Sequence, residues 1–258
     1  MTARRSVWAA LWRLARAVGH VIGGLWTIRT KFPGLTDAQR TERVRVWSLQ
    51  VLEILGVGLE ARGPLPPPEE GALLVANHIS WLDILVMNAV RPARFVSKAD
   101  VKRWPLLGSL ITGAGTLYLE RESRRDAMRV VHHVAERIQN NDLVAIFPEG
   151  TTGDGVALLP FHANLFQAAI AAQAPVRPVA LSFVHAGTGL RHDAPTYIGD
   201  TTLLASMWAT LRATDVQAVA TYGPAQWSGG RSRRDWAQAV RSDIAALREG
   251  PVASATAG

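Results

Sequence analysis

The alternation of short apolar runs with helical patterns, which begins after residue 70, constrains the fold more than any other feature of this sequence. The runs have the length and composition of strands, and apolar residues recur at helical spacing between them. We predict strands at residues 72–77, 93–98, 116–120, 143–148, 175–184 and 215–223. We predict helices at residues 81–90, 123–139, 165–173, 201–213 and 233–248. This order is typical of an α/β fold with a largely parallel central sheet flanked by helices.

Residues 7–28 show a different pattern, because apolar and polar residues lie on opposite sides of one predicted helix. The apolar side carries Trp8, Leu11, Trp12, Ala15, Val18, Ile22, Leu25 and Trp26. The polar side carries Arg13, Arg16, His20 and Thr27. Tryptophan on one side and arginine on the other are typical of a helix that lies in a membrane interface.

Three other interpretations apply to residues 7–28. A transmembrane helix needs an apolar run of about 20 residues, and Arg13 and Arg16 near the bilayer centre would cost roughly 5–7 kcal/mol. A cleaved signal peptide is disfavoured because charge breaks the apolar core and no clear cleavage site follows. A helix that packs on its own domain remains an alternative, since most amphipathic helices do so.

A second N-terminal helix is predicted after Pro33. Thr36 or Asp37 caps its start, it runs to about Leu55, and Gly56 or Gly58 ends it. Residues 62–71 then form a proline-rich connector. We therefore divide the chain into a helical, membrane-associating segment at residues 1–61 and an α/β domain at residues 62–258.

The charge of the chain is concentrated in the same N-terminal region. Residues 1–65 contain ten Arg or Lys and four acids, whereas the whole chain carries a formal net charge of +7. Such a segment indicates an anionic partner, either nucleic acid or a lipid surface. No helix-turn-helix, RNA-recognition or zinc pattern occurs, so we expect an anionic membrane surface and no nucleic acid. The absence of cysteine excludes disulfides, thiolate metal sites and a cysteine nucleophile.

A histidine and an aspartate follow the first predicted strand of the α/β domain. His78 can act as a general base near neutral pH, and a carboxylate such as Asp83 can fix its tautomer. Residues five positions apart point about 140° away from each other on a regular helix. Contact between them thus predicts an irregular strand-to-helix turn at His78. The alternative is that His78 and Ser80 only cap the helix and that Asp83 is solvated. A Ser80–His78 pair has poor geometry for proton transfer, and the metal-binding patterns are weak.

Polar groups also follow two other predicted strands. Arg121 follows residues 116–120, and Glu149 and Gly150 lie in the sequence FPEGT at residues 147–151. Ligands of such sheets bind beyond the carboxyl ends of the strands, so these groups are expected to converge. Taken alone, FPEGT is compatible with a tight turn and Arg121 with a surface arginine.

In this order the motifs resemble those of the glycerolipid acyltransferase family, in particular the bacterial 1-acylglycerol-3-phosphate acyltransferases. The NHxxxxD block matches Asn77, His78 and Asp83, and the second block is GAGTLYLERES with Arg121. The third block, FPEGT, matches at every position, and APVRPVAL around Pro175 resembles the fourth. The segment FVSKADVKRWPLLGSLITGAGT, with Lys98, resembles the family between its first two blocks.

The resemblance implies that residues 62–258 form a catalytic domain that transfers an acyl chain to the free hydroxyl of a lysolipid, most specifically 1-acylglycerol-3-phosphate. The donor is a thioester of coenzyme A or acyl carrier protein, with no other cofactor and no metal. His78 is the base, Asp83 orients it, and no acyl-enzyme forms. The substrate-binding residues implied are Asn77, Lys98, Arg121, Phe147, Pro148, Glu149, Gly150 and Thr151. The expected location is the cytoplasmic face of the inner membrane, with peripheral or monotopic attachment.

The sequence departs from the family pattern after FPEGT. Thr152 stands where arginine is common, and His162 and Asn164 replace a lysine and a glycine. Lyso-ornithine lipid or another lysophospholipid is therefore an alternative acceptor. A membrane-binding module without enzymatic activity is a further alternative, but it does not account for His78, Arg121 and FPEGT together.

Overall fold

A computed structural model describes residues 4–104, 107–119 and 124–249 of the chain. They form a seven-stranded sheet in the order β1-β7-β6-β2-β5-β3-β4. Neighbouring strands are parallel except β6 and β7, which are antiparallel. The strands are β1 (Val57–Arg62), β2 (Ala72–Ala76), β3 (Arg94–Lys98), β4 (Leu117–Leu119), β5 (Leu143–Ile146), β6 (Val176–His185) and β7 (Val216–Tyr222). The predicted fold class, a largely parallel sheet flanked by helices, is confirmed.

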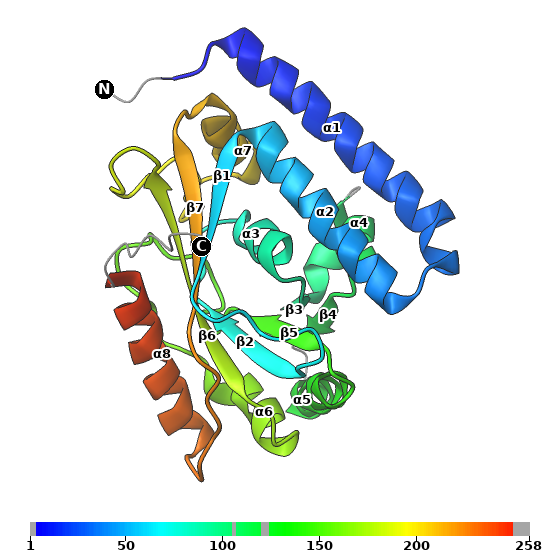
Figure 1. Ribbon diagram of the computed structural model, residues 1–258, viewed down its shortest axis with the longest axis vertical. Coiled ribbons are helices and arrows are strands. Elements are labelled where there is room, and N and C mark those ends of the chain that lie inside the picture. Colours follow the sequence, from blue (N-terminus) through cyan, green and yellow to red (C-terminus); the bar gives the residue numbers. More distant parts are fainter. Residues whose placement is uncertain (1–3, 105–106, 120–123, 250–258) are drawn as a thin grey trace, which may run out of the picture.

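Helices cover both faces of the sheet, as Figure 1 shows. On β2, Leu74 and Ala76 face a core shared with α1, α2 and α3, whereas Leu73 and Val75 face a core shared with α5, α6 and α8. This alternation follows from the two-residue repeat of a strand and makes β2 buried along its whole length. The α-helices are α1 (Val7–Thr30), α2 (Asp37–Leu55), α3 (Asp83–Val90), α4 (Leu107–Gly113), α5 (Arg124–Gln139), α6 (Phe166–Ala171), α7 (Leu203–Arg212) and α8 (Arg233–Glu249). Short 3-10 turns lie at Phe32–Gly34, Ala99–Arg103 and Ala163–Leu165.

Every predicted strand and helix has a counterpart, but β1 and α4 were not predicted. β1 pairs with β7 from Val57 opposite Val216 to Arg62 opposite Thr221. The predicted division between residues 61 and 62 therefore falls inside a strand of the sheet. The two-part organisation of the chain stays a prediction, and in the structure the helical N-terminal segment ends before Val57.

Local signals set both ends of α2. Thr36 accepts a hydrogen bond from the Gln39 backbone N–H, and the Gln39 side chain accepts one from the Thr36 N–H, which forms a capping box. Gly56 follows the helix in the left-handed conformation, with φ of 69°, which is favourable for glycine at this position. The caps expected at Thr36 and Gly56 are thus confirmed.

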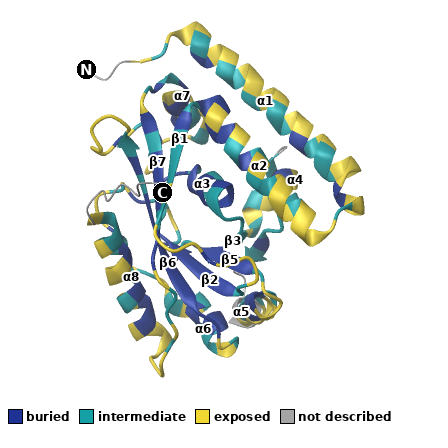
Figure 2. Ribbon diagram, in the orientation of Figure 1, coloured by how far each residue is buried: buried dark blue, intermediate teal, exposed yellow. Residues whose placement is uncertain are grey.

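Helix α1 contacts the rest of the chain through a side that contains the buried Ala10 and Gly24 as well as Arg13 and His20. The Arg13 Nη1 donates to the Ile54 carbonyl at 2.9 Å, and the His20 ring stacks on Trp47 with centroids 5.2 Å apart. The opposite side faces outward, with Trp8, Trp12 and Trp26 exposed by 82%, 67% and 68%, and Figure 2 shows this exposed side along the helix. Helix α1 thus packs on its own domain, as the alternative expected, but with the side opposite these tryptophans. Within the described ranges, no helix is both long enough and apolar enough to span a bilayer.

Candidate active site

The chain between β2 and α3 forms the irregular turn predicted around His78. Asp83 is the first residue of α3, and its Oδ2 accepts hydrogen bonds from the Ile79 N–H at 2.6 Å and the Ser80 N–H at 2.9 Å. The same oxygen lies 2.7 Å from the His78 Nδ1. Because the backbone folds around the carboxylate, the two side chains meet although they are five residues apart. The predicted contact between His78 and Asp83 is confirmed, and the solvated Asp83 of the alternative is wrong.

The pair has the arrangement that a histidine base requires. Asp83 is fully buried, whereas the His78 side chain is 20% exposed. An ionised carboxylate at Nδ1 selects the tautomer in which Nδ1 carries the proton and Nε2 has a free lone pair. Nε2 has no hydrogen-bond partner among the residues that the structure describes. It is therefore the ring nitrogen that can take a proton from a substrate.

The backbone and ring of His78 are held at three further points. Its N–H donates to the Glu149 Oε1 at 2.9 Å, and its carbonyl accepts from the Gly153 N–H at 2.7 Å. The Phe147 ring stacks on the imidazole with centroids 4.0 Å apart and planes within 9°. The β2–α3 turn and the FPEGT segment after β5 thus fix the imidazole together, as expected for neighbouring parallel strands.

Glu149 has a structural use that the sequence did not predict. Its carboxylate is 6% exposed, and its second oxygen accepts from the Leu159 N–H at 2.9 Å. Burial raises the pKa of Glu149, although the hydrogen bonds from the His78 and Leu159 backbones act in the opposite direction. Glu149 was expected to position the polar head of the acceptor; here both of its oxygens bind backbone groups. Glu149 thus links the turn at His78 to the segment that follows FPEGT, and its contact with the acceptor stays a prediction.

Comparisons with known proteins identify the family. A family model described as Acyltransferase matches residues 58–182. The 1-acyl-sn-glycerol-3-phosphate acyltransferase of Neisseria meningitidis is 44% identical over 158 residues, which are 61% of either chain. The lyso-ornithine lipid O-acyltransferase of Pseudomonas aeruginosa is 38% identical over 207 residues, which are 78% of this chain and 79% of that protein. The chain belongs to the acyltransferase family.

A solved structure shows the same fold. The 1-acyl-sn-glycerophosphate acyltransferase of Thermotoga maritima superposes with a TM-score of 0.71 at 16% identity. The match covers 96% of this chain and 97% of that one. It therefore includes the N-terminal helices as well as the sheet.

Three other residues that were predicted to bind substrate contact neighbouring parts of the protein. The Asn77 side chain is buried, donates to the Leu181 carbonyl at 3.0 Å and accepts from the Leu181 N–H at 2.7 Å. It therefore ties the end of β2 to β6, and its contact with substrate stays a prediction. Phe147 stacks on His78, and Pro148 is buried with its carbonyl bound to the His162 N–H at 2.8 Å. These residues build the site in the structure and were predicted to bind substrate.

The substrate contacts of the other predicted residues are likewise still predictions. Gly150 has φ of 71°, and its N–H closes a turn on the Phe147 carbonyl at 3.1 Å. Lys98 at the end of β3 and Thr151 are both exposed. Arg121 lies outside the described residues, two positions after β4 ends at Leu119. Within the described part of the chain, no three His, Asp or Glu side chains cluster in a way that could hold a metal ion.

Sequence reasoning missed the arginines that hold residues 153–159. Arg248 of α8 donates to the carbonyls of Gly155 and Val156, and Arg241 of α8 donates to those of Leu158 and Leu159. This segment also supplies the Gly153 N–H to His78 and the Leu159 N–H to Glu149. The departure from the family pattern after FPEGT was the available signal, but it gave no indication that α8 was involved.

Proposed function

We propose that this protein transfers an acyl chain from a thioester of coenzyme A or acyl carrier protein to the free hydroxyl of 1-acylglycerol-3-phosphate, which gives phosphatidate. The observation that carries the proposal is the His78 Nδ1–Asp83 contact, which leaves Nε2 free at a partly exposed site. Membership of the acyltransferase family supports it.

The reaction needs one proton to be taken and returned. The His78 Nε2 removes the proton of the lysolipid hydroxyl as its oxygen attacks the thioester carbonyl carbon, and Asp83 stabilises the imidazolium. The carbon–sulfur bond then breaks, and the imidazolium returns the proton to the departing thiolate. The acyl group moves directly between the substrates, so no acyl-enzyme forms.

The surface of α1 supports a position at the membrane. Trp8, Trp12 and Trp26 lie on its outward side, and the N-terminal segment is strongly basic. Apolar and aromatic side chains on a basic helix bind an anionic bilayer surface by burial and by charge. We propose peripheral attachment to the cytoplasmic face of the inner membrane, where the lysolipid resides.

A second acceptor is favoured by a specific observation. The P. aeruginosa lyso-ornithine lipid O-acyltransferase matches more of this chain than the meningococcal protein does. Thr152, which replaces a common arginine, donates its hydroxyl hydrogen bond to the Tyr197 carbonyl, so it adds no cation near FPEGT. Lyso-ornithine lipid is the alternative acceptor.

The acceptor is tested by the catalytic efficiency of the full chain on lysophosphatidate and on lyso-ornithine lipid in identical vesicles with one acyl donor. We expect a ratio above one in favour of lysophosphatidate. A ratio clearly below one would reject lysophosphatidate and leave acyl transfer standing. Absence of transfer to any lysolipid, with acyl-coenzyme A or acyl carrier protein, would reject the enzymatic proposal itself.

Arg121 sharpens the same test, because its family position implies contact with the acceptor phosphate. An interaction made equally in the ground and transition states affects mainly substrate binding. We expect Arg121→Ala to raise the KM for lysophosphatidate by about 10- to 150-fold, the range of a charge-assisted hydrogen bond, with the donor KM nearly unchanged. Equal effects on both substrates would contradict this role.

A further inference from the structure

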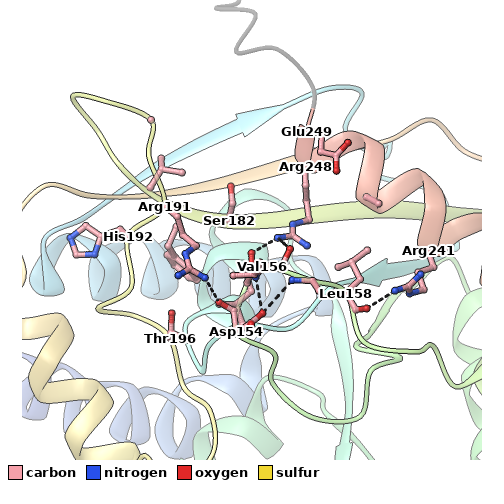
Figure 3. A pocket seen from close by; sticks show the side chains of 17 residues that line it. Asp154, Val156, Leu158, Ser182, Arg191, His192, Thr196, Arg241, Arg248 and Glu249 are labelled. Carbon is pink, nitrogen blue, oxygen red and sulfur yellow. Dashed lines mark hydrogen bonds between the residues drawn. The ribbon is translucent and has the colours of Figure 1, made fainter.

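A cavity of about 380 Å³ lies between residues 154–158, the carboxyl half of β6 and the end of α8. Ile79, the residue after His78, forms part of its wall, as do Ser182 and His192. Figure 3 shows Arg191, Arg241 and Arg248 around this space, with the side chains of the last two reaching from α8 toward residues 154–158. The cavity therefore adjoins the turn that carries the base, although it is not part of the His78–Asp83 pair.

The arginines of this cavity are only partly engaged. Arg241 uses Nε and Nη2, and Arg248 uses Nη2, for the backbone carbonyls of residues 155–159. Neither has an ion-pair partner in the part of the chain that the structure describes, whereas Arg191 pairs with Asp193 at 2.9 Å. A guanidinium bound to a carbonyl keeps its full charge and has donors left for another acceptor.

Two acids, Asp154 and Glu249, also line the cavity, so its three arginines exceed its carboxylates by one charge. The Asp154 Oδ1 accepts hydrogen bonds from the backbone N–H groups of Val156 and Ala157, and Glu249 is exposed. Burial lowers the pKa of His192, so it is neutral at neutral pH and adds no cation. The cavity thus offers two arginines in a form suited to a phosphate, which accepts several charge-assisted hydrogen bonds.

The topology distinguishes two sources of such a phosphate. Arg121, implied for the acceptor, follows β4, and β5 and β3 separate β4 from β2. The cavity adjoins β6, on the other side of β2. It also lies against α8, whereas α1 covers the opposite face of the sheet. A lipid acceptor held near α1 and a water-soluble donor can therefore reach His78 from different sides.

We propose that this cavity binds a phosphate of the acyl donor through Arg241 and Arg248, on the coenzyme A molecule or on the phosphopantetheine arm of acyl carrier protein. The inference rests on the proposed acyl transfer and names a site for one of its two substrates. The donor phosphate fixes the carrier beyond β6, and the flexible thioester arm extends from there toward His78.

The first test is calorimetric binding of desulfo-coenzyme A, which cannot react, to the full chain. Arg241→Gln and Arg248→Gln remove the charge and keep an amide donor for the carbonyls. We expect each to weaken binding by about 10- to 100-fold, and Arg248→Lys to restore part of the loss. Arg234→Gln, an exposed position on the same helix, is the matched control and is expected to bind normally. Unchanged binding in both cavity variants would overturn the proposal.

The second test separates the sources of the phosphate by steady-state kinetics. A rise in the KM for acyl-coenzyme A, with the KM for lysophosphatidate unchanged, is the expected result for both cavity variants. A rise for lysophosphatidate alone would assign the cavity to the acceptor, and a fall in kcat with both KM values unchanged would leave the arginines a purely structural role; either result overturns the proposal. If the wild-type chain binds desulfo-coenzyme A through these arginines but acylates no lysolipid, the cavity stands and the proposed function fails.

Discussion

Helix α1 and the turn that carries His78 depart in opposite ways from the usual distribution of side chains. In α1, Arg13 and His20 face the rest of the protein while Trp8 and Trp12 face outward. At the turn, the carboxylate of Asp83 is fully buried. Buried polar groups are favourable only when they are hydrogen-bonded, and the Asp83 Oδ2 accepts three such bonds.

The difference shows which kind of task each region can perform. Hydrogen bonds to the Asp83 Oδ2 hold the turn from within, so its groups are fixed and ready for chemistry. The outer side of α1 is not satisfied internally, because each exposed large side chain forgoes about 1.5–3 kcal/mol of possible burial. A lipid surface would supply that burial. The turn is thus the rigid region, and α1 is the region that needs a partner.

The largest effect is expected at the turn that carries His78. His78→Ala removes the base and should lower kcat by about 10²- to 10⁴-fold, measured as phosphatidate formed in vesicles that contain lysophosphatidate. His132→Ala, an exposed histidine on α5, is the control and should retain normal activity. Near-normal turnover by a folded His78→Ala protein would remove His78 from the mechanism.

The next largest effect is expected on membrane binding by the outer side of α1. Replacing Trp8 and Trp12 together with Glu should weaken partitioning onto anionic vesicles by about 100-fold, since each buried aromatic contributes at least about 1.5 kcal/mol. Flotation of the full chain at moderate salt measures the bound fraction. Trp227→Glu, an exposed tryptophan outside α1, should bind as the wild type does. Equal loss in both proteins would mean that the outer side of α1 is not the docking surface.

A smaller effect is expected from the link between the turn and residues 153–159. The Glu149 carboxylate accepts hydrogen bonds from two backbone N–H groups. Glu149→Gln places an amide NH2, which is a donor, against one of them. Leaving such a buried donor unsatisfied costs about 1–3 kcal/mol, so the free energy of unfolding in urea should fall by that amount. No loss of stability would contradict the internal role of Glu149.

The difference in stability between the wild type and Glu149→Gln should depend on pH with a definite sign. Because burial raises the pKa of Glu149 above its ordinary value of 4.5, the folded protein holds this proton more strongly than the unfolded chain does. The contribution of the protonated Glu149 to stability is fully present below pH 4.5 and is lost as the pH rises through the raised pKa. The stability of the wild type relative to Glu149→Gln should therefore decrease from acidic to neutral pH. An increase would contradict the direction of the shift.

The parts of the fold and the site that could be predicted are those with local signals. Asp83 lies five residues from His78, so the spacing allowed their contact through an irregular turn, and the resemblance to the NHxxxxD block favoured it. Asn77 bonds to Leu181, which is 104 positions away in the sequence. The Gly155 carbonyl accepts from Arg248, which is 93 positions away. No short motif records such partners. β1 was missed for the same reason: VGLEAR has a weak strand pattern, and its pairing with β7 defines it.

The central claim is that His78 and Asp83 act as one unit, and a double-mutant cycle tests it most directly. The catalytic efficiencies of the wild type, His78→Ala, Asp83→Asn and the double variant are measured on lysophosphatidate with one donor. If Asp83 acts only through His78, the double variant should be no slower than His78→Ala alone, because residues that act as a unit have strongly non-additive effects. Multiplication of the two single losses in the double variant would contradict the account, since the two residues would then contribute independently.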